Sequence, residues 1–151
     1  MRHPTGLLDT STVILLPRLD DASALPVAPQ ISAITLAELS VGPLVATTDT
    51  ERAARLAHLQ QAEADFEPLP FDADAARAFG QVAASLRRSG RKASARTYDA
   101  MIAAVALAND LPLYTSNPDD FQGIDGLIVV SVAVPGRSRH AAGDASSVPS
   151  G

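Results

Sequence analysis

The chain has 151 residues, of which 46% are hydrophobic, and it carries a formal net charge of −5 at pH 7 with no cysteine and three scattered histidines. This length favours one domain with a sizeable core, and the absence of cysteine excludes disulfides, thiolate zinc sites and cysteine nucleophiles. The acidic balance argues against nucleic-acid coating by bulk electrostatics, and a metal would have to be held by oxygen ligands, which favours Mg²⁺ or Mn²⁺.

The N-terminal apolar segment predicts a short strand followed by a helix. Residues 6–8 form an apolar run that stops at Asp9, and either Thr10 or Ser11 can cap the helix that follows. Prolines and acidic residues over 17–29 then mark a loop. The apolar segment is too short to span a bilayer and makes a poor signal-peptide core. We therefore expect a soluble, cytoplasmic protein with no membrane segment.

The next stretch predicts a second strand and two helices. Residues 30–34 form a short strand, after which Thr35 and Glu38 make a T-x-x-E capping box at the start of a helix. Residues 49–65 have apolar positions at helical spacing, which predicts an amphipathic helix. Residues 66–71 alternate apolar and polar side chains but contain two prolines, so we expect an edge strand there at best.

The second half of the chain predicts two more helices and two more strands. Residues 72–86 begin with acidic residues and continue with apolar positions at helical spacing. Thr97 is the predicted cap of a helix over 98–109, which is apolar nearly all round and should therefore be central. Residues 111–115 and 127–132 are apolar runs of strand length.

This alternation of strands and helices predicts an α/β fold. Right-handed crossovers give a mainly parallel sheet of four to five strands, with helices on both faces in a three-layer α/β/α arrangement. We expect one domain over residues 1–134. Residues 135–151 have no apolar periodicity, which predicts a disordered C-terminal tail.

Four acidic residues are predicted near the same end of this sheet. They follow strands or open helices at Asp9, Glu38, Asp99 and Asp120. Ligands in open α/β sheets bind beyond the carboxyl ends of the strands. Gathered carboxylates repel one another, and a divalent cation would relieve that repulsion. Such a cation can also activate a water and stabilise charge on a phosphoryl group.

Each acid also has a purely structural interpretation. Asp9 can be a helix N-cap, and the capping box explains Glu38. Asp99 lies in a first helical turn, where the helix dipole favours an anion. Asp119 and Asp120 can be ordinary turn residues. Four acids that act only as separate caps are a less probable explanation for this grouping at one sheet edge than one shared site.

A basic run precedes the central helix and consists of Arg87, Arg88, Arg91, Lys92 and Arg96. These residues are candidates for contact with a nucleic-acid backbone. Basic residues at a helix C-terminus also complement the helix dipole and stay solvated. Both interpretations are open from the sequence.

Four short motifs resemble the signature regions of PIN-domain ribonucleases. They are LLDTS at 7–11, ITLAEL at 34–39, YDAMIAA at 98–104 and TSNPDDF at 115–121. Their order and spacing are similar to those of VapC toxins of bacterial type II toxin–antitoxin systems. The resemblance extends from about residue 6 to residue 132, and the tail lies outside it.

The resemblance implies a PIN-like nuclease domain that hydrolyses RNA phosphodiester bonds with Mg²⁺ or Mn²⁺. It implies structured tRNA or rRNA as substrate, a homodimer, a cognate VapB-type antitoxin, and operator DNA binding only through the toxin–antitoxin complex. The motif positions assign catalysis and metal binding to Asp9, Glu38, Asp99 and Asp120, with Thr10, Thr115 and Asn117 as supporting polar residues.

Two other functions compete with the nuclease. A phosphatase of the haloacid dehalogenase type also places an Asp after its first strand, but that chemistry needs D-x-D, and Ser11 stands two residues after Asp9. A non-catalytic PIN-like module could bind RNA or a protein without cutting. The presence of all four acids argues against that module, because such a module has no need for a repulsive cluster.

Overall fold

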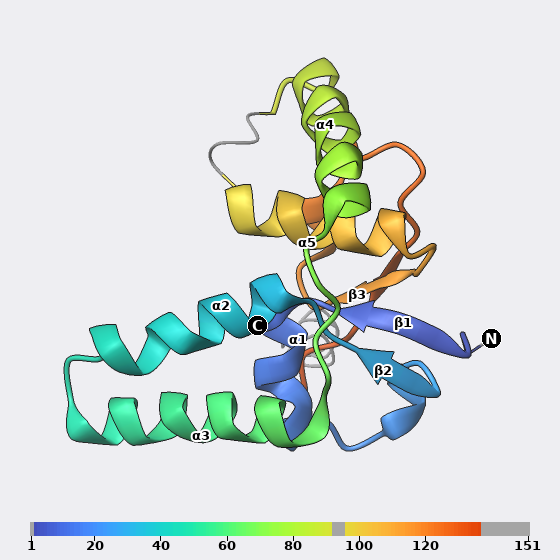
Figure 1. The fold of residues 1–151 in the computed structure, drawn as a ribbon. Coiled ribbons are helices and arrows are strands. Elements are labelled where there is room, and N and C mark those ends of the chain that lie inside the picture. The colour runs from blue at the N-terminus through green and yellow to red at the C-terminus, as the bar shows by residue number, and fades with distance from the viewer. Residues whose placement is uncertain (1, 92–95, 137–151) are drawn as a thin grey trace, which may run out of the picture.

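Four parallel strands form the centre of the molecule (Figure 1). The computed structural model describes residues 2–91 and 96–136. Within them the strands are β1 Thr5–Leu8, β2 Ala28–Gln30, β3 Leu113–Thr115 and β4 Val129–Ser131, in the spatial order β2-β1-β3-β4. Lys92 and all but the first two residues of the expected tail lie outside the described residues, so the disordered tail stays a prediction.

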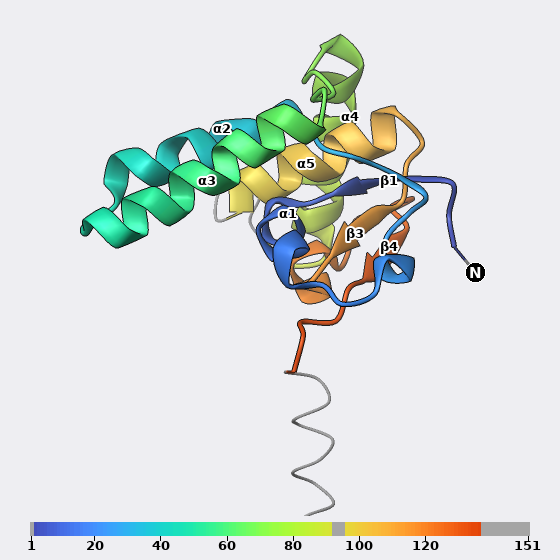
Figure 2. The ribbon, with the colours of Figure 1, turned by 90° about the horizontal axis from the view of Figure 1, so that it is seen from below.

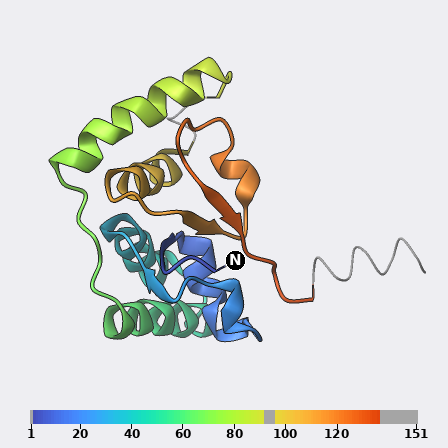
Figure 3. The ribbon, with the colours of Figure 1, turned by 90° about the vertical axis from the view of Figure 1, so that its right-hand side faces the viewer.

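Helices cover both faces of the sheet. They are α1 Thr10–Leu15, α2 Ala33–Val41, α3 Asp49–Asp65, α4 Ala73–Arg88 and α5 Thr97–Ala108. α4 and α5 lie on one face, and α1 and α3 lie on the other (Figures 1 and 3). The predicted three-layer α/β fold is therefore confirmed. No helix within the two described ranges is both long enough and apolar enough to cross a bilayer.

The core is divided by the sheet into two apolar clusters. Leu7 and Leu113 pack against α4 and α5, whereas Leu8 and Tyr114 pack with residues of α1, α2 and α3. This division follows from the alternation of side chains along a strand. α5 is buried over most of its length, including the alanines at 103, 104 and 106. Small side chains let the helix lie close to its neighbours, which fixes the position of its N-terminus.

α2 and α3 form a hairpin that projects past the sheet (Figure 2). They are joined by a 3₁₀ turn, η3, over Gly42–Val45, in which Pro43 is buried and Leu44 is 84% exposed. α2 also packs against α1 and α5, and Glu38 in its second turn reaches Thr10, the first residue of α1.

The second strand lies earlier than expected. β2 covers Ala28–Gln30 and includes Pro29, a residue that the sequence pattern assigns to a loop. A proline is tolerated here because β2 is an edge strand and its missing N–H is not needed by a neighbour. Residues 66–71 do not form a strand: only Leu69 pairs, through one parallel bridge to Ser32.

The expected capping box is wrong. Ser32 caps α2, and its hydroxyl accepts a hydrogen bond from the Thr35 backbone N–H at 3.2 Å. The helix therefore begins three residues earlier than a Thr35 cap would place it, and Glu38 moves to the second turn. Since Glu38 is not needed to cap the backbone, its carboxylate is available for other contacts.

Candidate active site

The four acids are grouped where the chain reverses its direction across the sheet. β1 is followed along the chain by its neighbour β2 on one side, and β3 lies on the other side of β1. Such a switch point leaves an opening beyond the carboxyl ends of the two central strands. Asp9 directly follows β1, and residues 116–121 directly follow β3. Glu38, in the second turn of α2, and Asp99, in the first turn of α5, lie at the same end.

Asp9 is 4% exposed and is surrounded by hydrogen-bond donors. It caps α1, so neither Thr10 nor Ser11 is the cap. Its Oδ1 accepts from the Thr12 backbone N–H at 3.0 Å and from the Thr12 hydroxyl at 2.7 Å. Its Oδ2 accepts from the Thr115 hydroxyl at 2.5 Å, and the Ser11 hydroxyl lies within 3.1 Å of both oxygens. These donors stabilise a buried carboxylate in one orientation.

Glu38 is oriented by Thr10. The Thr10 hydroxyl donates to Glu38 Oε1 at 2.6 Å and also lies 3.0 Å from Thr35 Oγ1. Burial raises the pKa of Glu38 above its ordinary value, the hydrogen bond from Thr10 opposes the rise, and the charge of Asp9 adds to it. The charge of Asp9 therefore acts on Glu38.

Asp99 lies at the centre of the acidic group. It is the third residue of α5, where the helix dipole favours an anion. Burial nevertheless raises the pKa of Asp99 to about 6, with further contributions from the charges of Asp120, Glu38 and Asp9, in that order. The guanidinium of Arg96 opposes the rise. Repulsion and burial together outweigh the helix dipole, so Asp99 is the acid whose charge most needs a cation.

Asp120 and Asp119 point to different neighbours. Both lie in the 3₁₀ helix η5, Pro118–Phe121. The Asp120 carboxylate forms an ion pair with Arg96, whereas the Asp119 carboxylate accepts from the Gln122 side chain at 3.0 Å. Of these two aspartates, only Asp120 is among the charges that raise the pKa of Asp99.

A depression of about 460 Å³ opens over two of these acids and is lined by Glu38, Arg96, Thr97, Tyr98 and Asp99. The donors around it are carboxylate oxygens, which are the ligands that Mg²⁺ and Mn²⁺ prefer. Within residues 2–91 and 96–136, however, no three acidic or histidine side chains are arranged closely enough to hold a metal ion. Both carboxylate oxygens of Asp9, and one oxygen each of Glu38 and Asp120, are instead bound by protein donors.

Comparison with known proteins places this arrangement in a family. The family model described as PIN domain matches residues 7–127. The chain belongs to the PIN domain family. The ribonuclease VapC5 of Mycobacterium tuberculosis is 43% identical over 129 residues, which cover 84% of this chain and 93% of the relative.

Solved structures agree with this assignment. The VapBC-5 toxin–antitoxin structure from Mycobacterium tuberculosis superposes with a TM-score of 0.73 at 43% identity and covers 87% of this chain and 99% of the matched chain. The DNA-bound VapBC structure from Salmonella typhimurium gives a TM-score of 0.69 at 28% identity and covers 88% and 100%, respectively.

Most of the basic residues that the structure describes before α5 in this PIN domain are not paired with the four acids. Arg88 forms an ion pair with Asp125, and Arg91 donates to the Asp119 backbone carbonyl at 2.7 Å. These two contacts tie the end of α4 to the segment after β3. Arg87 is exposed in the last turn of α4, and Lys92 lies outside the described residues. Only Arg96 of the described members contacts an acid of the site.

Several polar residues of this PIN domain site were missed by the sequence interpretation. Thr12 and Thr35 are fully buried, and Ser11 lies 2.9 Å from Ser116 through their hydroxyls. The sequence signal was weak: the T-S-T run after Asp9 suggested only a helix cap. Thr115 was expected, and it also accepts from the Asn117 backbone N–H at 2.9 Å. The Asn117 side-chain amide lies 3.4 Å from the Ser116 hydroxyl. Within the described residues it forms no hydrogen bond with any of the four acids.

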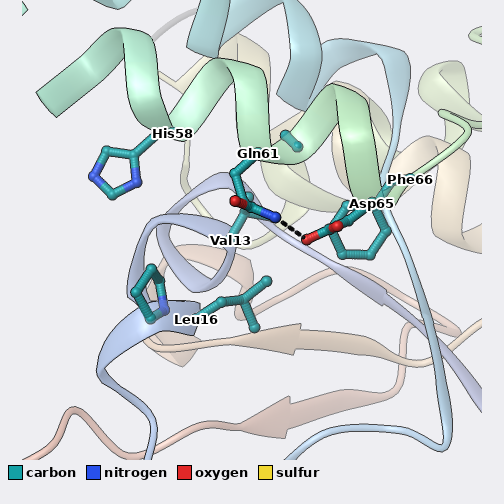
Figure 4. Close-up of a pocket in the computed structure, with 8 residues that line it drawn as sticks. Val13, Leu16, His58, Gln61, Asp65 and Phe66 are labelled. Atoms are coloured by element: carbon teal, nitrogen blue, oxygen red, sulfur yellow. Dashed lines mark hydrogen bonds between the residues drawn. The ribbon is translucent and has the colours of Figure 1, made fainter. Parts of the chain in front are cut away.

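A second hollow of about 310 Å³ lies between α1, the 3₁₀ turn η1 at Leu16–Arg18, and α3 (Figure 4). Val13 and Leu16 form an apolar wall, and the Gln61 amide donates to Asp65 at 2.7 Å. None of the four acids lines this hollow. His58 is at its edge, so this histidine lies away from the candidate site.

Proposed function

We propose that this PIN domain is an RNA-cleaving toxin of the VapC type. The observation that carries the proposal is the convergence of three carboxylates, those of Asp9, Glu38 and Asp120, on Asp99 at the carboxyl ends of β1 and β3. This chain, which carries the acidic group, is 43% identical to the ribonuclease VapC5 of Mycobacterium tuberculosis. A water that attacks a phosphodiester needs activation and needs charge stabilisation at phosphorus, and an acidic group with a hard cation suits both tasks.

The cofactor in this proposal is Mg²⁺ or Mn²⁺. Asp9 and Asp99 would be the main ligands, and Glu38 and Asp120 would complete the set. The all-oxygen donor set fits these cations. The pKa of Asp99 is raised by burial and then by repulsion from its neighbours, and a cation would offset both effects. When bound, the cation lowers the pKa of a water and stabilises negative charge on the phosphoryl group.

The other residues of the site have positioning roles in this proposal. Thr12, Thr115 and Ser11 hold the carboxylate of Asp9 in one orientation. Thr10 holds Glu38 in the same way. Asn117 extends this polar set through Ser116 and through its own N–H to Thr115. A site of this kind requires its ligands to be fixed by packing and hydrogen bonds before the substrate arrives.

The proposed partners follow from the relatives. The two structures described above are VapBC structures, and the one from Salmonella typhimurium is bound to DNA. For this chain we propose a VapB-type antitoxin, a homodimer, and binding to operator DNA only as the antitoxin complex. The proposed substrate is structured tRNA or rRNA, with Arg87, Arg88, Arg91, Lys92 and Arg96 as the candidates for backbone contact.

Nuclease activity is the direct test. Protein freed of antitoxin should cut a structured RNA in the presence of Mg²⁺ or Mn²⁺, and excess EDTA should stop the reaction. Cleavage would be followed on end-labelled tRNA and rRNA fragments. Wild-type protein that binds Mn²⁺ but leaves all these RNAs intact would contradict the proposed substrate class.

Metal binding should weaken in acid. Because the pKa of Asp99 is about 6, this carboxyl is mostly charged at pH 7.5 and mostly protonated at pH 5. A proton on a ligand competes with the cation, so Mn²⁺ affinity should fall about tenfold per pH unit below pH 6. Calorimetric titration between pH 5 and pH 8 measures this dependence. An affinity that is flat from pH 5 to pH 8 would remove Asp99 from the ligand set.

The arrangement of the acids also favours a second candidate, the non-catalytic PIN module. Asp9, Glu38 and Asp120 are satisfied by protein donors in this structure. Such a module would bind RNA or a partner with the acids in that arrangement. It predicts no Mg²⁺ or Mn²⁺ binding at millimolar concentration, which the same titration decides.

A further inference from the structure

The Arg96–Asp120 ion pair has a place in the site that the other ion pairs lack. Arg96 immediately precedes α5, and its guanidinium contacts the carboxylate of Asp120. The same guanidinium lowers the pKa of Asp99, so its charge acts on two of the four acids. A single cationic side chain therefore supplies part of the positive charge that the acidic group requires.

We propose that Arg96 is an exchangeable counter-ion of the site. In the metal-free protein it neutralises Asp120, and on activation it releases Asp120 to the cation and turns to a phosphate of the RNA. This inference rests on the proposed function, and it assigns to Arg96 a role distinct from general backbone contact. It also explains why the acids are near one another without forming a cage for a metal.

Arginine can release Asp120 only by moving its guanidinium to another anion, here a phosphate. The guanidinium stays charged at all physiological pH values, so it cannot release Asp120 by losing its proton. Both members of the pair are partly exposed, with side-chain exposures of 45% for Arg96 and 30% for Asp120. Ion pairs at such positions are weak, whereas a guanidinium can bind a phosphate through two parallel hydrogen bonds.

The position of Arg96 also suits the exchange. Arg96 lines the same depression as Glu38 and Asp99, so a phosphate held there would lie beside its guanidinium. Arg88 and Arg91 differ in this respect, because they pair with Asp125 and with the Asp119 backbone carbonyl and do not line this depression. Neither is among the charges that act on Asp99.

Arg96→Met tests the exchange through metal binding without RNA. Removal of the competing guanidinium should tighten Mn²⁺ binding about three- to tenfold, because Asp120 is then free and the site is more negative. The matched control is Arg77→Met, which removes an arginine that pairs with Asp74 on the exposed surface of α4. Calorimetry should give the control the wild-type Mn²⁺ affinity.

The same variants separate binding of metal from binding of RNA. Arg96→Met should raise the KM for a structured RNA about tenfold with a smaller effect on kcat, and Arg96→Lys should recover part of this loss. A double-mutant cycle between Arg96→Met and Asp120→Asn, read from thermal unfolding in EDTA, checks that the pair exists in the metal-free protein. Positive coupling between the two residues supports the proposal.

The results that overturn the inference are distinct. Unchanged or weaker Mn²⁺ binding by Arg96→Met overturns the exchange and leaves the nuclease in place. Absence of coupling in the cycle overturns the metal-free pair. If the wild type binds neither Mg²⁺ nor Mn²⁺, the proposed metal-dependent function falls, and the exchange falls with it.

Discussion

Asp99→Asn is expected to lower RNA cleavage by about 10²–10³-fold and to make the metal-free protein more stable at neutral pH. The loss of activity follows from the removal of a charged ligand at the centre of the acidic group. The gain in stability follows from the removal of a half-buried charge that three other carboxylates repel. A substitution that abolishes function and stabilises the fold is typical of a site built for a ligand.

The pH dependence of this gain has a defined sign. The pKa of Asp99 rises from 3.8 to about 6 on folding. Between these values the unfolded chain loses its proton first, so the charge at Asp99 costs the native protein stability as the pH rises, and the cost is complete above pH 6. The full shift corresponds to ~3 kcal/mol, and solvent screening at this half-exposed site reduces it to ~1 kcal/mol.

Chemical denaturation in EDTA at pH 3.5 and pH 7.5 measures the effect. Asp99→Asn and wild type should have similar free energies of unfolding at pH 3.5, and the variant should be more stable at pH 7.5. Added Mn²⁺ should stabilise the wild type and have little effect on the variant. A variant that is less stable than the wild type at pH 7.5 would mean that Asp99 is not repelled by its neighbours.

Asp9→Asn is expected to remove activity to a similar extent, but with the opposite effect on stability. The carboxylate of Asp9 is buried and accepts hydrogen bonds from Thr12, Thr115 and Ser11. An amide has one acceptor oxygen where the carboxylate has two, so some of these donors lose their partner. Charge-assisted hydrogen bonds of this kind contribute roughly 1–3 kcal/mol each, and we expect a loss of about 2 kcal/mol.

The comparison between the two variants isolates the environment of each acid, because the chemical change is the same. Both proteins would be unfolded in urea at pH 7.5 in EDTA, and both would be assayed on the same RNA with Mn²⁺. Stabilisation of the protein by Asp9→Asn would show that the donors around this carboxylate do not offset the cost of its burial.

Much of the fold was accessible from the sequence because its longer elements have clear periodicity. α3 spans Asp49–Asp65, as the apolar spacing predicted, and the apolar helix over 98–109 is α5, shifted by one residue because Thr97 begins the helix and does not cap it. The strands β3 and β4 lie inside the predicted apolar runs, and β1 begins one residue before the predicted run over 6–8. These elements place Asp9 and Asp99 at the same end of the sheet.

The remaining features depend on contacts between distant parts of the chain. Pro29 is acceptable in β2 only because that strand is at an edge of the sheet. Ser32 replaces Thr35 as the cap of α2, and Ser32 also pairs with Leu69. The support of Asp9 by Thr115 joins residues 106 positions apart. Local propensity carries no information on such pairings.

The separation between Asp9 and Thr115 has a consequence for the newly made chain. β1 is synthesised well before its partner β3, which begins at Leu113. Until β3 leaves the ribosome, Asp9 lacks the Thr115 hydroxyl, and Asp120 has not yet been added. A nascent chain therefore holds no complete acidic group. For the nuclease we propose, activity begins only when synthesis of the domain is nearly finished.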